Sequence, residues 1–338
     1  MTRGGDRPAV KKLLILTHHR LDLWVAPAWF SHRIRELYPQ LHVVALTTYD
    51  GIEDELRDTD IAFTGSIRPE QFQLARRLRW VHSPSAAVHQ FLFPDFVSSD
   101  VLLTNAREVH GPVVAEHVLG LMFAMAKQIP QALRYQQKHV WAQGILWSSP
   151  MRPRELAGGT VGLVGLGSIG RKVAKHASAL GMHVIGVREH PEKGKPDFVD
   201  EVLSSAKLDD MLGRVDYLVL STPVTPSTRG MIARHQFSRM NPGSYLINVG
   251  RGPLIHEPDL IVALREHQIA GAALDVFEKE PLPADSRLWD LENLLITPHT
   301  AGMTEKLWER HYQLFSENLE RFLSGQRLLG LVDKRQGY

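Results

Sequence analysis

Residues 161–170 read VGLVGLGSIG, a short apolar stretch that runs into a glycine-rich turn. The glycines have the spacing G-x-G-x-x-G, and the apolar residues that follow have the periodicity of a helix. That spacing alone is weak evidence, but between a strand and a helix it favours a pyrophosphate-binding turn over a purely structural one. The first glycine permits the tight turn, the second lets the backbone approach the phosphates, and the third lets the helix pack on the strand. The residues expected to contact such a ligand are Gly165, Gly167, Ser168, Ile169 and Gly170.

Further apolar segments follow this turn, most of them separated by stretches long enough for a helix. They are apolar at consecutive positions, as expected of parallel strands that helices cover on both faces. The segments are residues 183–187, 216–221, 244–250, 270–276 and 293–298. The turn and these strands together predict a doubly wound dinucleotide-binding domain of the Rossmann type.

A separate series of β-rich segments precedes the turn and predicts a second, smaller parallel α/β domain. Between the two series, residues 113–127 are expected to form a long, mostly buried helix, and the irregular stretch 141–153 marks a boundary or an oligomer-forming arm. Residues 305–323 carry one apolar stripe at helical spacing. The fold class is therefore α/β, with two parallel-sheet domains. The early segments are residues 13–17, 42–48, 61–65, 78–83 and 101–105.

The composition excludes several classes of function. At 338 residues the chain is long enough for two domains, and Lys and Arg (39) nearly balance Asp and Glu (37), with no basic block typical of nucleic-acid binding. The chain has no cysteine for a thiolate site, and its 17 His residues show no ligand spacing, so no metal is expected. The apolar run 13–16 is too short for a signal peptide, and 118–126 is too short to span a bilayer. We therefore expect a cytoplasmic protein with no membrane or nucleic-acid partner.

The residues about 20 positions beyond the glycines bear on the choice between NAD and NADP. NAD-preferring sites of this type carry Asp or Glu at the end of the second strand, where the carboxylate holds the ribose hydroxyls. Here Arg188 and Glu189 occupy this place. A guanidinium pairs with a ribose 2′-phosphate through bidentate hydrogen bonds, whereas a carboxylate repels it. The sequence thus favours NADP, and Glu189 keeps NAD open because a shift of one residue in the strand end would exchange the two roles.

Three segments at the ends of the later strands carry charged residues. Arg251 lies in INVGRG, Glu280 in LDVFEKEPLP and His299 in ITPHTAG. The carboxyl ends of strands in a doubly wound sheet face the ligand crevice. A guanidinium can bind a carboxylate and polarise the carbonyl beside it, and a histidine held by a carboxylate can transfer a proton near neutral pH. Each residue alone fits an ordinary surface role, but the spaced trio favours catalysis.

With these segments the chain resembles the D-isomer-specific 2-hydroxyacid dehydrogenase family over nearly its whole length. The resemblance rests on VGLVGLGSIG, TPVTPSTRG, NPGSYLINVGRGPLI, GAALDVFEKEPLP and TPHTAG, which occur in the family's order and at its spacing. It implies a D-specific, NAD(P)-dependent reductase of small 2-oxo acids such as glyoxylate or hydroxypyruvate. Arg251 would bind the substrate's carboxylate and carbonyl, His299 would act as acid and base, and Glu280 would be its partner. The resemblance also implies cofactor contacts from Thr222, Pro223, Thr228, Val249, Gly250, Asp275 and Ala301.

The resemblance further implies an arrangement of domains. A cofactor domain, residues 107–301, would be inserted into a flavodoxin-like substrate domain made of residues 1–106 and 302–338. A homodimer would form through the cofactor domains, with residues 120–150 as an arm. Two alternatives stay open: a dinucleotide-sensing interaction protein similar to transcriptional corepressors, and an NAD-linked dehydrogenase of a phosphorylated acid such as phosphoglycerate.

The family binds substrate carboxylates partly through backbone N–H groups of a loop of the form S-x-G-V-D. Residues 83–89 read SPSAAVH, with Ala87 in place of the glycine and His89 in place of the aspartate. The N–H groups of Ala86 and Ala87 are expected to bind the substrate. Because alanine lacks glycine's freedom at positive φ and imidazole changes the charge of the loop, these departures leave the substrate's side chain unassigned.

Overall fold

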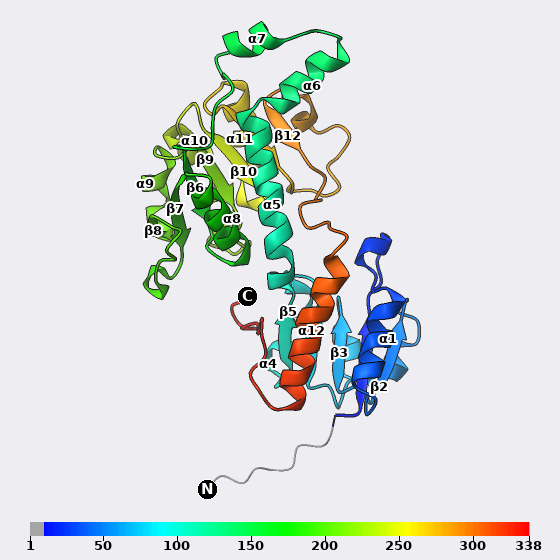
Figure 1. Cartoon of the computed structure of the whole chain (residues 1–338). Coiled ribbons are helices and arrows are strands. Elements are labelled where there is room, and N and C mark those ends of the chain that lie inside the picture. The colour runs from blue at the N-terminus through cyan, green and yellow to red at the C-terminus, as the bar shows by residue number, and fades with distance from the viewer. Residues whose placement is uncertain (1–9, 338) are drawn as a thin grey trace. The chain divides into compact units, whose positions relative to one another are not determined.

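The computed structural model describes residues 10–337. These residues divide into two compact units. Unit 1 consists of the described residues up to His110 and those from Met303 onward, and unit 2 consists of Gly111–Gly302. Each unit is built on its own parallel sheet (Figure 1). The prediction of two parallel-sheet α/β domains is therefore confirmed.

Unit 1 has a five-stranded sheet with the strand order β2-β1-β3-β4-β5, which is the flavodoxin-like order. Its strands are β1 (Lys12–Leu16), β2 (His42–Leu46), β3 (Ile61–Thr64), β4 (Trp80–Ser83) and β5 (Leu102–Asn105). Successive side chains of β1 point to opposite faces: Leu13 and Ile15 join one apolar core, and Leu14 and Leu16 join another. The first core is covered by α1 (Ala28–Leu37) and α12 (Leu307–Leu323), and the second by α2 (Ile52–Leu56), α3 (Pro69–Phe72) and α4 (Pro94–Ser98).

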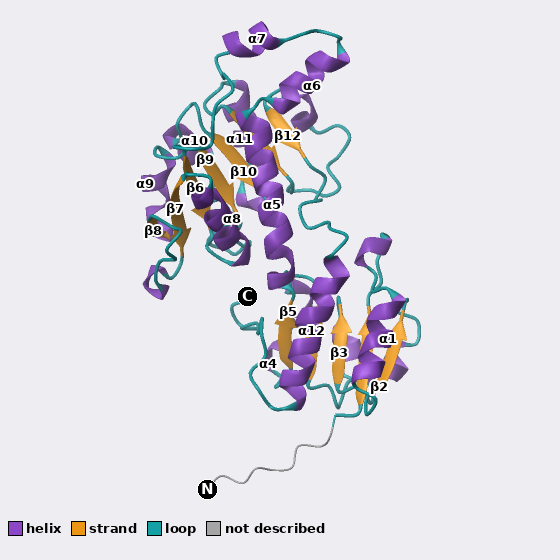
Figure 2. Ribbon diagram, viewed as in Figure 1, coloured by secondary structure: helices purple, strands orange, loops and turns teal. Residues whose placement is uncertain are grey.

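Unit 2 has a seven-stranded sheet with the order β12-β11-β10-β9-β6-β7-β8 (Figure 2). The chain moves outward from β6 to β8 and then returns to β9 on the other side of β6, and ligands bind at such a reversal in doubly wound sheets. The strands are β6 (Thr160–Val164), β7 (His183–Arg188), β8 (Glu201–Ser204), β9 (Tyr217–Leu220), β10 (Tyr245–Asn248), β11 (Gly271–Leu274) and β12 (Leu294–Ile296). One face is covered by α5 (Arg107–Ala126) and α8 (Ser168–Ala179), and the other by α9 (Leu208–Leu212), α10 (Arg234–Arg239) and α11 (Glu257–Arg265).

The strand β8 has no counterpart among the segments expected from sequence. It lies at the edge of the sheet, pairs with β7 alone among the described strands, and all 4 of its residues are only partly buried. A partly exposed edge strand needs no continuous apolar run, so its sequence EVLS gives little signal.

Two short helices, α6 (Ile129–Gln137) and α7 (Gln143–Ser148), follow α5 and precede β6. We call residues 129–148 the arm. Several large apolar side chains of the arm are exposed, namely Ile129, Leu133, Val140, Trp141, Ile145 and Trp147. Trp141 is the extreme case, with 89% of its surface exposed. The arm lies within residues 120–150, where the resemblance implies an oligomer-forming segment, and it overlaps the irregular stretch 141–153.

The helix α5 is long and apolar enough to cross a membrane by length and composition. In its 18-residue apolar window, 50% of the residues are buried inside the protein. Ala115, Val118 and Met122 are fully buried in the core of unit 2. Core helices of soluble proteins pass the same test, so α5 is weak evidence for a membrane span.

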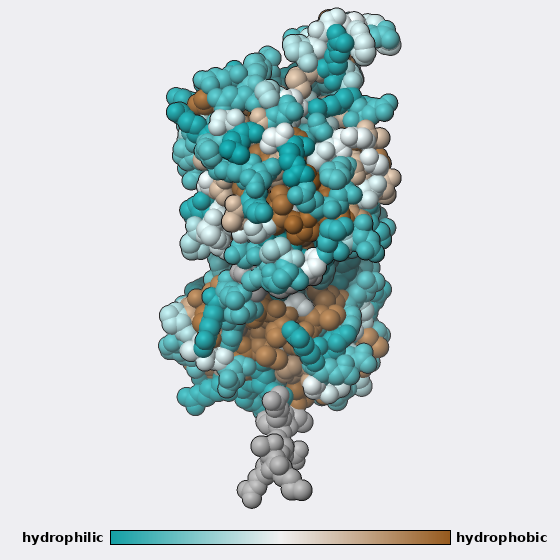
Figure 3. Space-filling view, turned by 90° about the vertical axis from the view of Figure 1, so that its left-hand side faces the viewer, coloured by the Kyte–Doolittle hydropathy of each residue, from teal (hydrophilic) through white to brown (hydrophobic). Residues whose placement is uncertain are grey.

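The face shown in Figure 3 is mostly hydrophilic, with apolar side chains gathered in limited patches on each unit.

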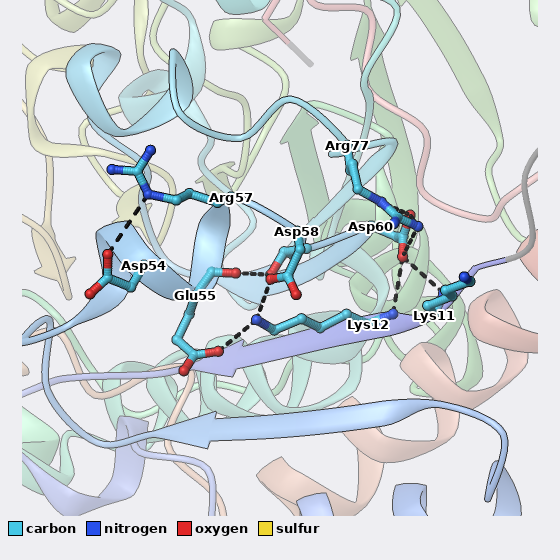
Figure 4. Close-up of polar contacts among 9 residues, drawn as sticks. Lys11, Lys12, Asp54, Glu55, Arg57, Asp58, Asp60 and Arg77 are labelled. Atoms are coloured by element: carbon cyan, nitrogen blue, oxygen red, sulfur yellow. Dashed lines mark hydrogen bonds and ion pairs between the residues drawn. The ribbon is translucent and has the colours of Figure 1, made fainter.

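A network of charged side chains lies at the amino ends of the unit 1 strands (Figure 4). Lys12, the first residue of β1, is 6% exposed, and its Nζ lies 2.7 Å from Glu55 Oε2 and is hydrogen-bonded to Asp58. Asp60, just before β3, accepts the backbone N–H of Lys12 at 3.0 Å and pairs with Arg77 Nη2 at 3.0 Å. Because these charges lie at the end of the sheet opposite to the carboxyl ends of its strands, we assign them to stability.

Candidate active site

The carboxyl ends of five neighbouring strands of unit 2 carry residues that the sequence singles out. In the sheet these strands follow one another as β12-β11-β10-β9-β6. The residues are Gly165 after β6, Thr222 after β9, Arg251 after β10, Asp275 after β11 and His299 after β12. Since parallel strands end at the same edge, the fold gathers these residues along one rim of the sheet.

The glycine-rich turn between β6 and α8 leaves room for a ligand. Gly165 has a φ of +102°, a left-handed backbone conformation that favours glycine. A Cβ on Gly170 would lie 1.9 Å from Gly165 O, so only glycine lets α8 start this close to the strand. A Cβ on Gly167 would meet no atom of the described residues within 4 Å, so the space there is open. This opening lies beside the N-terminus of α8 at Ser168, and the two features together fit the pyrophosphate of a dinucleotide.

The strand β7 ends at Arg188, with Glu189 just beyond it. Arg188 is partly buried, its Nη1 lies 3.4 Å from Gly194 O, and it forms no ion pair with another residue of the described part of the chain. The carboxylate of Glu189 accepts a hydrogen bond from Ser205 Oγ at 2.9 Å. The guanidinium is thus open to an anion, whereas the neighbouring carboxylate already has a partner.

His299 and Glu280 form a close pair. His299 Nδ1 lies 2.6 Å from Glu280 Oε2, and the other carboxylate oxygen of Glu280 accepts the backbone N–H of Phe277 at 2.9 Å. The side chains of His299 and Glu280 are 50% and 33% exposed, so the pair remains open to a ligand. His299 has a φ of +54°, a strained conformation that costs roughly 1 kcal/mol or more and persists only where its surroundings impose it.

Arg251 stands on a tightly bonded turn after β10. Asn248 donates its side-chain amide to Arg251 O at 3.0 Å and accepts the backbone N–H of Gly250 at 3.0 Å. Arg251 Nη1 donates to Gly250 O at 2.7 Å. Desolvation lowers the pKa of Arg251, while the charge of Glu280 acts in the opposite direction. The guanidinium therefore lies within the electrostatic reach of Glu280 and remains a cation at neutral pH.

Gly252, the next residue, is a site feature that sequence reasoning misses. A Cβ at this position would lie 1.9 Å from Phe277 C and 2.0 Å from Phe277 O. The absence of a side chain lets the Arg251 turn pack directly on the backbone that leads to Glu280. The proximity of the Arg251 guanidinium to the Glu280 carboxylate thus depends on a glycine that lies in the INVGRG segment but to which the sequence pattern gives no role of its own.

Asp275 organises the loop that carries His299. Its side chain is 1% exposed, and its Oδ1 accepts the Thr297 hydroxyl at 2.6 Å and the N–H of Thr300 at 2.9 Å. Its Oδ2 accepts the N–H of Ala301 at 3.0 Å. The backbone N–H of His299 donates to the main-chain oxygen of Asp275 at 2.9 Å. Most of the acceptor capacity of Asp275 is thus used within the protein, which leaves room for one further donor on Oδ2.

The other residues expected at the cofactor also lie along this rim. Thr228 donates its hydroxyl to Pro223 O at 2.8 Å and so closes the loop after β9. Val249 is 6% exposed, and its N–H donates to Leu220 O at 3.2 Å. A Cβ on Gly250 would lie 2.9 Å from Thr222 O, so the loops after β9 and β10 touch. The remaining two are Ile169, partly buried on α8, and Ala301, 4% exposed in the His299 loop.

A second residue near the site to which the sequence patterns give no role is His117, on α5. Its Nε2 lies 3.1 Å from Thr297 Oγ1 and 3.7 Å from Asp275 Oδ1. Burial lowers the pKa of His117, and the charge of Asp275 opposes this effect. Thr297 lies 180 residues further along the chain, so no local pattern could pair the two residues.

In unit 1, Ala86 and Ala87 lie in the loop after β4. Ala86 is exposed, and its carbonyl accepts the side-chain amide of Asn105 at 2.8 Å. Within residues 10–337 neither alanine donates its backbone N–H to another residue. His89, which replaces the family's aspartate, is exposed at the end of this loop.

Residues 119–301 match the model of a known family, the NAD-binding domain of D-isomer-specific 2-hydroxyacid dehydrogenases. The chain belongs to this family. The resemblance seen in the sequence is thus confirmed, and so is the expectation that this dehydrogenase is an oxidoreductase dependent on a nicotinamide dinucleotide. Among residues 10–337, no group of three or more His, Asp or Glu side chains is placed to hold a metal ion.

Relatives of this 2-hydroxyacid dehydrogenase cover most of its length. It is 30% identical over 322 residues to a glyoxylate reductase of Korarchaeum cryptofilum, a match that covers 94% of this chain and 90% of that protein. It is also 30% identical over 309 residues to a D-3-phosphoglycerate dehydrogenase of Methanocaldococcus jannaschii, with 89% of this chain but only 57% of that relative covered. One similar solved structure is that of the NADPH-dependent glyoxylate/hydroxypyruvate reductase of Sinorhizobium meliloti in complex with NADP and sulfate. It matches with a TM-score of 0.79 and 29% sequence identity, and the match covers 97% of this chain and 100% of that one.

Proposed function

We propose that this protein reduces small 2-oxo acids of the glyoxylate or hydroxypyruvate type to D-2-hydroxy acids with NADPH. The observation that carries the proposal is the 2.6 Å distance between His299 Nδ1 and Glu280 Oε2, at the rim of strand carboxyl ends that also bears Arg251. The names of two similar proteins support the substrate class, since one is a glyoxylate reductase and the other a glyoxylate/hydroxypyruvate reductase.

In this proposal His299 supplies the proton that the reduction requires. Glu280 holds Nδ1, so Nε2 is the nitrogen available to the substrate. As the carbonyl carbon gains a hydride, negative charge develops on the oxygen, and the imidazolium donates its Nε2 proton there. In the reverse direction the neutral imidazole accepts the hydroxyl proton of the 2-hydroxy acid. A bound dinucleotide would supply or accept the hydride.

Arg251 anchors the substrate in the proposed reaction. Its guanidinium can donate two hydrogen bonds to the carboxylate and carbonyl oxygens of an oxo acid. Because a cation at the carbonyl oxygen stabilises charge that grows in the transition state, it also accelerates the reaction. Arg251→Lys keeps the charge but loses the planar pair of donors, so we expect a higher KM together with a lower kcat.

We infer NADP as the preferred cofactor. The support is Arg188 at the end of β7, which has no carboxylate partner among the described residues. The similar structure from Sinorhizobium meliloti holds NADP. Comparison of kcat/KM for NADPH and NADH tests this preference, and a clear preference for NADH would overturn it.

We further propose that unit 2 binds the dinucleotide and that unit 1 contributes to the substrate site. This division follows the expected cofactor domain at 107–301. The open N–H groups of Ala86 and Ala87 support a role in binding a carboxylate. Because His89 stands where the family has an aspartate, this loop carries one negative charge fewer than the family pattern, which favours binding of an anionic substrate. Ala87→Pro, which deletes one donor, is expected to raise KM for the oxo acid more than KM for NADPH.

A homodimer formed through the arm is part of the same proposal. Leu133 is 51% exposed, Trp147 is 61% exposed, and exposed apolar groups of this size are typical of surfaces that a partner covers. Light scattering after gel filtration is expected to give twice the chain mass, and Leu133→Lys to shift it toward the monomer. A monomeric wild-type chain would refute the dimer.

The expected cytoplasmic location can be tested by fractionation of cells that make the protein.

A spectrophotometric screen tests the proposed activity. Loss of NADPH absorbance is followed with glyoxylate, hydroxypyruvate, pyruvate and 3-phosphohydroxypyruvate as substrates. We expect turnover with at least one unphosphorylated acid and a loss of roughly 100-fold or more in His299→Ala. Tight NADPH binding without turnover would favour a dinucleotide sensor instead, and turnover confined to the phosphorylated acid would favour a phosphoglycerate-type dehydrogenase.

A further inference from the structure

We propose that His117 is a positioning residue for the catalytic loop: it donates a hydrogen bond to Thr297 and, through Asp275, fixes the backbone that carries His299. His117 does not touch the reacting atoms in this scheme. The inference rests on the proposed function for its kinetic readout, and on geometry within unit 2 for the rest.

The direction of the hydrogen bonds follows from the groups present. Asp275 is buried, and as a carboxylate it can only accept, so the Thr297 hydroxyl at 2.6 Å must donate to it. The oxygen of Thr297 then presents only lone pairs to His117 Nε2 at 3.1 Å. His117 must therefore carry a hydrogen on Nε2, which gives a chain of bonds from His117 through Thr297 to Asp275.

This chain ends at the backbone of the catalytic loop. The carboxylate of Asp275 also accepts the N–H groups of Thr300 and Ala301, and its main-chain oxygen accepts the N–H of His299. The loop is thus held on both sides of His299 by one buried residue. His117 reaches this network from α5, a helix outside the loops after β11 and β12.

The strained conformation of His299 explains why such support matters. A φ of +54° is unfavourable for a residue with a side chain, and it lasts only while neighbouring bonds impose it. If His117 is removed, the Thr297 oxygen loses a donor and the Thr297–Asp275 contact can shift. The loop can then relax toward an ordinary backbone conformation, and the imidazole of His299 spends less time beside Glu280.

The kinetic test compares His117→Leu with His117→Gln. Leucine fills the space without a donor, whereas the amide of glutamine can still donate to Thr297. We expect kcat to fall roughly 10- to 100-fold in His117→Leu, with KM for NADPH little changed, and to recover largely in His117→Gln. His176→Leu, an exposed histidine on α8, is the matched control and is expected to behave as wild type. Equal activity of His117→Leu and wild type, or equal losses in both His117 variants, would overturn the proposal.

A second readout does not depend on activity. Amide hydrogen exchange of Thr300 and Ala301, whose N–H groups bind Asp275, is expected to be faster by roughly tenfold or more in His117→Leu than in wild type. The melting temperature of each variant shows whether unit 2 as a whole has lost stability. Unchanged exchange at these two amides, in a variant that folds, would refute the positioning role even if the chain reduced no oxo acid.

A double-mutant cycle with Thr297→Val shows whether His117 acts through Thr297. Valine has the shape of threonine but lacks the hydroxyl that links the two sides of the chain of bonds. If His117 acts only through this hydroxyl, adding His117→Leu to Thr297→Val lowers kcat no further. Losses that multiply would show that His117 acts by another route and would contradict the proposal.

Discussion

Gly252→Ala tests whether the active site depends on a close backbone contact. The new Cβ would lie 1.9 Å from Phe277 C and 2.3 Å from Glu278 N, where ordinary contact begins near 3.4 Å. The two segments must therefore separate by about 1.5 Å, because the obstructing atoms are backbone. A misplacement of this size between Arg251 and Glu280 is expected to lower kcat/KM by about 100-fold. Overpacking of this kind also costs about 1 to 3 kcal/mol of stability, a fall in Tm of roughly 2 to 10 °C.

The assay is NADPH-dependent reduction of an oxo acid at varied substrate concentration, with Tm measured in parallel. Gly120→Ala is the matched control, since a Cβ there would meet no atom of residues 10–337 within 4 Å and the position lies within helix α5. Alanine at this helical position is expected to keep activity and to raise stability by about 0.5 to 1 kcal/mol. If Gly252→Ala kept the activity and Tm of the wild type, the claim that this contact places Arg251 would be wrong.

Three further predictions concern the cofactor and the stability of unit 1. Arg188→Glu is expected to lower kcat/KM for NADPH by at least about tenfold while affecting NADH less, and a uniform loss with both cofactors would count against the 2′-phosphate role. Lys12→Met is expected to cost about 1 kcal/mol at neutral pH. Burial lowers the pKa of Lys12, but the hydrogen bonds and charges of Asp58 and Glu55 together raise it above its usual 10.5. The pairing therefore stabilises the fold fully below pH 10.5, and this stabilisation is lost as the pH rises through the folded-state pKa. The difference in Tm between Lys12→Met and wild type is thus expected to close in strong alkali. Burial lowers the pKa of His82 from 6.5 to about 3, so the folded chain keeps this imidazole neutral. Stability is therefore expected to fall as the pH drops below 6.5, because the unfolded chain then binds a proton that the folded chain does not. His82→Phe is expected to flatten this dependence of Tm on pH, and an unchanged slope in the variant would contradict the assignment to His82.

Much of the fold follows from local sequence patterns. The glycine turn at 165–170 and the apolar runs that become β6, β9, β10 and β11 are visible because parallel strands are buried on both faces. Arg251, Glu280 and His299 could be found for a related reason, since all three stand just beyond such strands. By contrast, β8 is a partly exposed edge strand, and its sequence lacks the apolar run that marks the others.

The features that the sequence did not reveal depend on contacts between distant segments. Gly252 matters because Phe277 packs against it, and His117 because Thr297 lies beside it in the folded chain. The left-handed backbone of His299 is another case, because the hydrogen bonds that Asp275 makes within this loop hold it and the residues next to His299 in the sequence do not predict it. The sequence predicts Asp275 at the cofactor, and this contact stays a prediction; the bonds that Asp275 makes within the protein hold the catalytic loop.

The most direct test of the proposed chemistry is a single turnover of enzyme-bound NADPH with glyoxylate or hydroxypyruvate, timed in H2O and in D2O. If His299 protonates the carbonyl oxygen as the hydride arrives, the wild-type rate falls in D2O, and His299→Ala is slower by roughly 100-fold or more. A His299→Ala variant that oxidises NADPH with these acids as fast as the wild type would contradict the central role given to this histidine.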